Sequence, residues 1–175
     1  MIILKSPREI DRMRKACKIA YEVLCMLRDL VSPGVTSYDL DRLASEETAK
    51  HGAKCAFKGY HNYPSSLCCS PNSQVVHGLP TRTPLASGDI LSLDFGVLID
   101  DFYGDAAVTV PVGSISAVAE KLIIATENSL YAGIAMAVSG NRLGDVSFAI
   151  QNYVETRGFS VVRDFVGHGI GKCLH

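Results

Sequence analysis

The order of helix signals repeats along the chain at one offset, and this repeat constrains the possible folds more than any other feature. With 106 subtracted from its number, each of four residues in the second half falls on an identical residue in the first half: Lys121 on Lys15, Gly140 on Gly34, Asp145 on Asp39 and Gly158 on Gly52. Both halves show a helix pattern, a break, a second helix pattern and a glycine. This order predicts a fold built from two copies of one unit.

The first half opens with two helix signals. Ser6-Pro7-Arg8-Glu9 is a capping sequence, and the apolar residues after it recur at spacings of three and four. Together they predict a helix over residues 7–30. Thr36 or Ser37 caps a second predicted helix, which ends near residues 51–52.

A hairpin is predicted to follow these helices. Glycine, asparagine and proline are frequent over residues 58–72, which predicts a loop. Residues 90–97 have the composition of a strand, Asp100-Asp101 predicts a turn, and residues 102–112 form the returning strand.

The second half restarts the pattern. A helix is predicted from Ser116 or Ala117 to residue 138, and another from 144 to about 157. Residues 159–166 then predict a strand, and residues 167–171 a glycine-rich turn.

Composition excludes several classes of protein. Of the 175 residues, 47% are hydrophobic and 20% are charged, and the net charge is −1. Such a chain can bury a core, whereas its balanced charge gives no basic surface for nucleic acid and no reason to expect a membrane partner. The first 14 residues carry charges of both signs and lack the apolar centre of a signal peptide, so the expected compartment is the cytoplasm.

Two aspartates lie on the two arms of the predicted hairpin. Asp94 and Asp105 are eleven residues apart, although Asp is disfavoured inside strands. Two buried carboxylates that face each other repel and are poorly solvated, and a divalent cation between them would remove both costs. The alternative is that Asp105, next to Gly104, is a turn residue and that Asp94 ends a strand.

Three histidines and a cysteine are further candidates for a site. His168 lies between two glycines, where an imidazole could reach a metal or simply face solvent. His77 follows two valines, which suits a half-buried loop residue or a hydrogen-bonded core histidine. His175, the last residue, could be a frayed end. Cys68 could be a nucleophile paired with His77, but no third orienting group is apparent.

Taken together, these motifs resemble the signature of the methionine aminopeptidase family. The resemblance rests first on the sequences around three candidate residues: Ser-Leu-Asp94-Phe-Gly, Gly104-Asp105-Ala-Ala and Val-Gly-His168-Gly-Ile-Gly. Four further stretches resemble the type I subgroup: Ser6–Ile10, Pro33–Thr36, Gly59–Pro64 and Val76–Pro80. These stretches span the chain from start to end.

The resemblance implies an α/β (α+β) fold of the pita-bread type, in which two pseudo-symmetric helix pairs flank a curved antiparallel sheet. It implies one metalloaminopeptidase domain over residues 1–175, with a first repeat at about 7–112 and a second at about 116–175. The second repeat has no counterpart of the hairpin, so we expect it to be truncated at its C-terminal end. Family members carry two further glutamate ligands on that later hairpin.

The resemblance also assigns roles to residues of this sequence. The implied metal ligands are Asp94, Asp105 and His168. The implied catalytic residues, which would hydrogen-bond the substrate and the developing oxyanion, are His77 and His175. The residues implied to line a pocket for the methionine side chain are Tyr60, Tyr63 and Cys68. Two positions depart from the subgroup pattern: Leu174 replaces an aromatic residue and Phe57 replaces a small one.

The implied activity is hydrolytic removal of the initiator methionine from nascent polypeptides. In the complete family site, a water held by two divalent metals (Co, Mn, Fe or Zn) performs the attack, and we expect the metal site of this chain to be incomplete. Whether this chain is itself active, and in which oligomeric state, is left open. Two alternatives remain: a catalytically defective paralogue that binds peptides, and a prolidase-like peptidase of the same fold.

Overall fold

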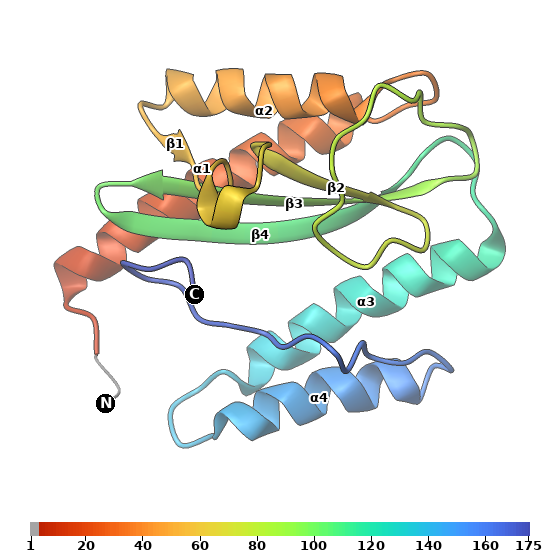
Figure 1. The fold of residues 1–175 in the computed structure, drawn as a ribbon. Coiled ribbons are helices and arrows are strands. Elements are labelled where there is room, and N and C mark those ends of the chain that lie inside the picture. Colours follow the sequence, from red (N-terminus) through yellow and green to blue (C-terminus); the bar gives the residue numbers. More distant parts are fainter. Residues whose placement is uncertain (1–3) are drawn as a thin grey trace. The chain divides into compact units, whose positions relative to one another are not determined.

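The computed structural model describes residues 4–175, and these form two compact units. The first unit joins the chain up to Ile115 with the C-terminal segment His168–His175. The second unit is Ser116–Gly167. The two units contain the helices and strands labelled in Figure 1.

Both helices predicted in the first half are confirmed. Helix α1 spans Pro7–Leu30, with Pro7 in its first turn and a capping box between Ser6 and Glu9. Helix α2 spans Ser37–Lys50, and the Thr36 hydroxyl caps it by accepting a hydrogen bond from the Asp39 backbone N–H.

The first unit contains a four-stranded antiparallel sheet with β3 (Ile90–Ile99) at its centre. Strand β4 (Phe102–Pro111) pairs with one edge of β3. Strands β1 (Lys54–Cys55) and β2 (Leu67–Pro71) pair with β3 on its other side. The β3–β4 hairpin confirms the predicted one.

A two-residue turn sets the register of this hairpin. Asp100 and Asp101 have φ angles of 52° and 64°, as a type I′ turn requires, and Asp tolerates this left-handed conformation better than most residues. The turn is also tied to α1, because Lys15 Nζ lies 2.8 Å from Asp100 Oδ2. Ile99 therefore pairs with Phe102, and each earlier residue of β3 pairs in step with a later one of β4.

Strand β2 corrects the prediction of a loop over residues 58–72. Its residues Leu67, Cys68 and Cys69 are buried and pair with Phe95, Asp94 and Leu93 of β3. The run is five residues long and lies beside proline and asparagine, so its local sequence resembles a loop. Only pairing with β3 makes it a strand.

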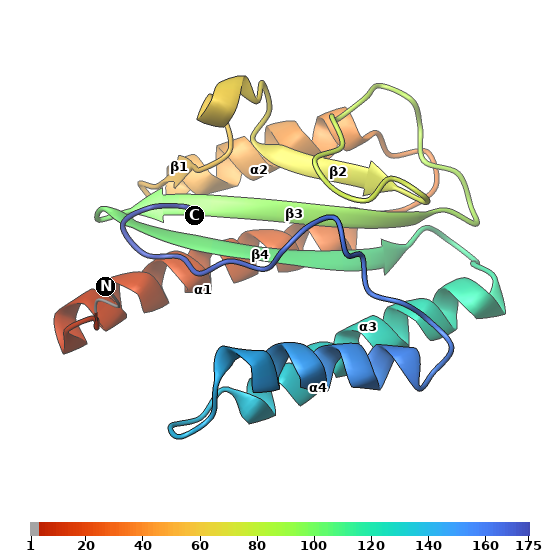
Figure 2. The same ribbon diagram turned by 60° about the horizontal axis from the view of Figure 1, so that its bottom comes forward.

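Alternation along β3 separates the two faces of the sheet. Leu91, Leu93, Phe95 and Val97 are fully buried and form one core with residues of α1 and α2. On β4, a Cβ at Gly104 would collide with the α1 backbone at Ala16, so Gly104 allows the close approach of helix and strand. Both ribbon views show α1 running along the β3–β4 hairpin (Figure 1 and Figure 2).

The second unit consists of α3 (Ala117–Met136) and α4 (Leu143–Glu155), which confirms its two predicted helices. They pack closely at Gly133, where an added Cβ would lie 2.7 Å from the Ile150 side chain. The strand predicted over residues 159–166 was wrong, because no strand forms among residues 116–167. A strand needs a neighbour to pair its backbone groups, and this unit has none to offer.

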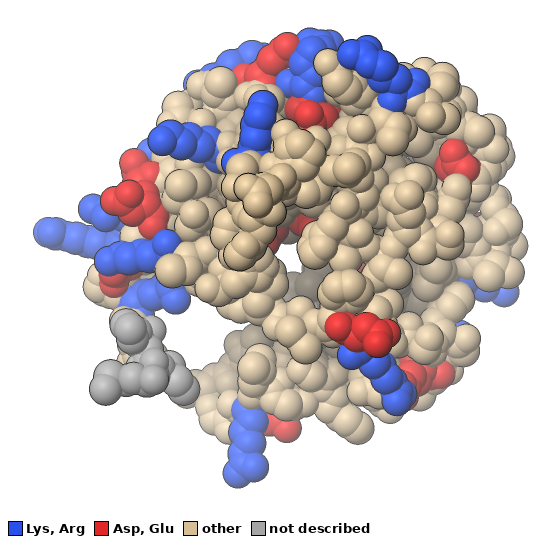
Figure 3. Space-filling model, in the orientation of Figure 1, with Lys and Arg blue, Asp and Glu red and all other residues tan. Residues whose placement is uncertain are grey.

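Helix hydropathy and surface charge can both be compared with the composition of the chain. Within residues 4–175, no helix is long and apolar enough to cross a bilayer. On the face drawn in Figure 3, basic and acidic side chains are interspersed, and the described residues gather into no single basic patch there.

Candidate metal and substrate site

Strand alternation and the hairpin register bring Asp94 and Asp105 to one face of the sheet. Asp94 lies between the buried Leu93 and Phe95, so its side chain is on the face away from α1 and α2. Asp105 pairs directly with Gly96, two residues further along β3, and so is on the same face. The structure therefore brings together the two carboxylates that the sequence singled out.

The surroundings of these carboxylates favour their neutral forms. Burial, followed by the charge of Asp105 and a hydrogen bond with it, raises the pKa of Asp94 to about 7. Burial also raises the pKa of Asp105, although nearby His168 and His175 and the hydrogen bond with Asp94 oppose the shift. Below about pH 7, Asp94 therefore holds a proton that it can donate to Asp105.

The two histidines of the C-terminal segment lie beside the carboxylates. His168 Nε2 is 3.6 Å from Asp105 Oδ2, and its Nδ1 is 3.2 Å from the Gly169 carbonyl oxygen. The rings of His168 and His175 have centroids 4.3 Å apart. His175 is therefore part of the cluster and not a frayed end.

Tyr60 holds His175 from the other side. Its hydroxyl lies 2.9 Å from His175 Nδ1, and the two rings stack with centroids 5.4 Å apart. Tyr60 comes from a short 3-10 turn, Tyr60–Asn62, that follows the left-handed Gly59. The sequence resemblance assigned Tyr60 to a pocket, and the structure adds this contact with His175.

A small apolar cluster adjoins the histidines. Its buried members are Phe57, Cys68 and Leu174, and partly buried side chains pack against them: Ala56, Tyr60, Tyr63 and Tyr103. The two positions that depart from the subgroup pattern, Phe57 and Leu174, thus meet in one cluster with Cys68. Sequence analysis missed Tyr103, although strand alternation places it on the same face as Asp105.

Hydrogen bonds orient the Tyr63 hydroxyl, and burial determines the protonation of the Cys68 thiol. The Tyr63 hydroxyl is within donating distance of the carbonyl oxygens of Leu67, at 3.1 Å, and Gly78, at 2.9 Å. Burial raises the pKa of the Cys68 thiol to about 11, although the hydrogen bond with Tyr63 opposes the shift. A thiol that stays protonated at neutral pH is a poor nucleophile, which argues against the Cys68–His77 alternative.

His77 lies on an exposed loop that is fastened to β2. It has a left-handed φ of 58°. The next residue, Gly78, donates its N–H to Ser70 Oγ at 3.1 Å, and its carbonyl oxygen accepts the Cys69 N–H at 2.8 Å. A Cβ at Gly78 would collide with the Cys69 carbonyl, so only glycine allows this approach. His77 therefore precedes a residue, Gly78, that is held by β2 and that also accepts a hydrogen bond from the Tyr63 hydroxyl.

The donor set suits a divalent cation, although its members are not arranged as ligands. Within residues 4–175, no group of three or more His, Cys, Asp or Glu side chains is placed to hold a metal ion. However, the two half-buried carboxylates have raised pKa values, and a cation beside them would lower those pKa values again. Oxygen ligands with one imidazole suit Mn, Fe, Co or Zn. Metal ligation by Asp94, Asp105 and His168 thus stays a prediction.

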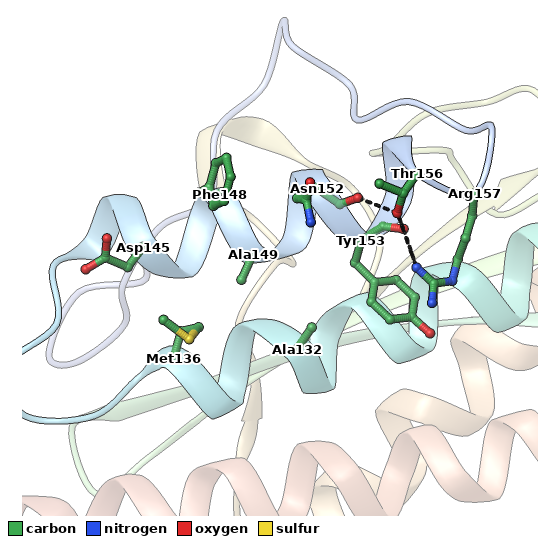
Figure 4. A pocket seen from close by; sticks show the side chains of 9 residues that line it. All are labelled: Ala132, Met136, Asp145, Phe148, Ala149, Asn152, Tyr153, Thr156 and Arg157. Atoms are coloured by element: carbon green, nitrogen blue, oxygen red, sulfur yellow. Dashed lines mark hydrogen bonds between the residues drawn. The ribbon is translucent and has the colours of Figure 1, made fainter.

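A separate groove lies within the second unit, between α3 and α4 (Figure 4). Its cavity volume is about 440 Å³. It is lined by Ala132, Met136, Asp145, Phe148, Ala149, Asn152, Tyr153, Thr156 and Arg157. None of the site residues predicted from the sequence lines it.

Comparison with known proteins places the chain in a family. Residues 11–175 match the model of metallopeptidase family M24. The methionine aminopeptidase of Clostridium perfringens is 55% identical over the whole chain, which covers 70% of that protein. The crystal structure of the methionine aminopeptidase from Thermotoga maritima superposes with a TM-score of 0.97 at 44% identity, and the match covers the whole chain and 71% of that structure.

Prolidases share the fold at a greater distance. Prolidase from Pyrococcus furiosus has a TM-score of 0.85 but only 20% identity, and the chain covers 50% of it. This likeness supports the fold alone, so the prolidase-like alternative is not favoured. The expected pita-bread architecture of helices and antiparallel sheet is confirmed, and the chain belongs to metallopeptidase family M24, where methionine aminopeptidases match it over all its residues at 44–55% identity.

Proposed function

We propose that this chain binds a divalent metal ion and the N-terminal methionine of polypeptides, and acts in hydrolysing the bond after that methionine. Membership of a metallopeptidase family and the whole-length match to methionine aminopeptidases support the reaction class. One observation carries the site: Asp94 and Asp105 lie side by side on the sheet face opposite the core, with His168 against Asp105.

Asp94, Asp105 and His168 would hold the metal. A bound divalent ion supplies Lewis acidity and lowers the pKa of a water ligand, which makes a nucleophile available at neutral pH. The protein contributes a half-buried pair of oxygen donors that favours a cation over two separate charges. The choice among Co, Mn, Fe and Zn, and a second metal in the site, belong to the same proposal.

His175 and His77 would bind the carbonyl of the bond to be cleaved. When the Tyr60 hydroxyl donates to Nδ1 of neutral His175, the ring proton is on Nε2, which can donate to the substrate oxygen. Such a donor is most valuable when negative charge develops on that oxygen. His77, on its fastened loop, would supply a second donor.

The cluster around Cys68 would receive the methionine side chain. Phe57, Leu174 and Cys68 offer apolar and polarisable surface, which suits a thioether. Tyr63 turns its hydroxyl to backbone carbonyls and so presents its ring to the cluster. The partners of the chain would accordingly be the N-termini of nascent polypeptides.

Metal binding by variants tests this proposal. Calorimetry with Mn²⁺ should give a dissociation constant at least about tenfold higher for Asp94→Asn and for His168→Ala than for the unaltered chain. Asp101→Asn is the matched control, because it removes an exposed aspartate from the hairpin turn and should leave binding unchanged. Equal Mn²⁺ affinity in all four proteins would contradict the ligand assignment.

Substrate choice tests the second part. A Met-Ala-Ser peptide should bind or be cleaved in preference to Leu-Ala-Ser and to an Ala-Pro dipeptide. Preference for Ala-Pro would revive the prolidase-like alternative. Binding of Met-Ala-Ser without any cleavage, with Mn²⁺ bound, would favour the peptide-binding alternative.

A further inference from the structure

The segment His168–His175 carries two of the three site histidines, His168 and His175, yet it belongs to no helix or strand. It includes Gly169 and Gly171, which make an unsupported chain costly to order. Placing His168 and His175 against Asp105 and Tyr60 therefore requires contacts elsewhere along the segment. Three contacts with the rest of the first unit provide them.

Two of these contacts are on the sheet. The Tyr103 N–H donates to the Gly171 carbonyl oxygen at 2.9 Å, so the segment is fastened to β4 near the start of that strand. Leu174 is buried against Phe57 and Cys68. In Figure 1 and Figure 2 the dark-blue end of the chain lies beside the β3–β4 hairpin accordingly.

The third contact joins the segment to the start of α1. Lys172 Nζ lies 3.3 Å from Glu9 Oε1 and 5.8 Å from the centre of the Phe102 ring. Lys172 is thus held between the first turn of α1 and the first residue of β4. It is adjacent in sequence to Gly171, as Phe102 is to Tyr103, so the ion pair and the backbone hydrogen bond are parts of one attachment.

Glu9 divides its carboxylate between two tasks. Oε2 accepts hydrogen bonds from the Ser6 N–H and the Ser6 hydroxyl, both at 2.9 Å, and Oε1 faces Lys172. The bonds with the Ser6 backbone and hydroxyl, followed by Lys172, lower the pKa of Glu9 to about 2. The carboxylate is therefore ionised at neutral pH, and the capping box holds it at a fixed position for Lys172.

We propose that Glu9 and Lys172 are positioning residues, which form a clamp that places His168 and His175 in the site. This inference rests on the proposed function for the roles of the two histidines. The competing account is that Glu9 only caps α1 and that Lys172 is an ordinary exposed lysine. Exposed ion pairs are weak, so the clamp should act through a fewfold change in local order and not through global stability.

Two variants separate the accounts. Lys172→Met removes the clamp and leaves the capping box, whereas Ser6→Ala removes the cap hydroxyl and leaves the ion pair. Lys172→Arg keeps the charge and should restore the contact. Lys50→Met is the matched control, because it removes another exposed lysine from an ion pair, with Glu47 at 2.7 Å on α2.

The readouts are amide hydrogen exchange at Tyr103 and Mn²⁺ affinity, both on the full 175-residue chain. With Lys172→Met we expect Tyr103 exchange to become about three- to tenfold faster and Mn²⁺ binding to weaken by a similar factor. Lys172→Arg and Lys50→Met should match the unaltered chain in both readouts. Ser6→Ala should speed exchange in the first turn of α1 and change Tyr103 less than Lys172→Met does.

Unchanged Tyr103 exchange in Lys172→Met would overturn the clamp, as would a larger Tyr103 effect in Ser6→Ala. Failure of the proposed function looks different. If His168→Ala leaves Mn²⁺ affinity unchanged, His168 is not a ligand, while the Tyr103 readout still decides whether Lys172 and Glu9 order the segment.

Discussion

The two faces of β3 differ in nearly every physical respect, although their residues alternate along one strand. On one face, Leu91, Leu93 and Phe95 are fully buried beneath helices. On the other, Asp94 lies beside Asp105 with raised pKa. The first face stabilises the fold, whereas the second holds two like groups close together at a cost in stability. One strand can contribute to the core and to the site because its side chains point alternately to the two faces of the sheet.

The largest expected effect is on the buried face. Phe95→Ala removes a fully buried ring and should lower the free energy of unfolding by about 3–5 kcal/mol. That is a large part of the ~5–15 kcal/mol typical of a domain. Urea unfolding followed by circular dichroism measures the loss. A decrease below about 1 kcal/mol would mean that this face is not the main source of stability.

Asp94→Asn should act in the opposite direction in the metal-free protein. The pKa of Asp94 is raised from its ordinary value of 3.8 to about 7, so the folded state loses stability relative to the unfolded state as the pH rises between these values. Asn removes that loss, and we expect a gain of about 1–4 kcal/mol at pH 8. Thermal unfolding in the presence of a chelator measures it.

The pH dependence is the control for this prediction. The advantage of Asp94→Asn should grow from about pH 4 to about pH 7 and then level off. Addition of Mn²⁺ should reverse the order of stability, because only the unaltered site binds the ion well. A metal-free Asp94→Asn protein that is less stable than the parent at pH 8 would remove the contrast between the two faces.

Tyr60→Phe tests the hydrogen bond that holds His175 in the site on the second face. The substitution removes the hydroxyl that meets His175 Nδ1 and keeps the ring that stacks on it. One neutral hydrogen bond contributes about 0.5–1.5 kcal/mol, so the variant should fold normally and bind or cleave Met-Ala-Ser up to about tenfold less well. Nitrogen NMR of the His175 ring should show a changed tautomer ratio, and an unchanged ratio would separate Tyr60 from His175.

The smallest expected effect is at the capping box of α1, outside both faces of β3. Because the pKa of Glu9 is lowered to about 2 from 4.5, the capping box contributes stability that is fully present above pH 4.5 and is lost as the pH falls towards 2. Hydrogen exchange in the first turn of α1 should therefore show local fraying before global unfolding. Glu9→Gln should abolish the pH dependence, and its persistence in that variant would point to another group.

Local sequence was sufficient for most of the secondary structure. The bounds of α1 and the hairpin turn followed from a capping box and from two adjacent aspartates, signals that act over a few residues. The errors fell where a strand depends on its neighbours. Residues 67–71 became a strand because β3 was available, and residues 159–166 did not because no strand in their unit was.

In the candidate site, too, some features follow from local sequence and others from contacts between distant residues. The sequence by itself determined the hairpin that carries Asp94 and Asp105, and once its two-residue turn and strands form, alternation brings both side chains to one face. Only the tertiary structure decided that Tyr60 meets His175, 115 residues later, and that His168 lies against Asp105. Such contacts depend on how the C-terminal segment docks on β4 and α1. Ordering that segment requires packing and hydrogen bonds that no short stretch of sequence contains.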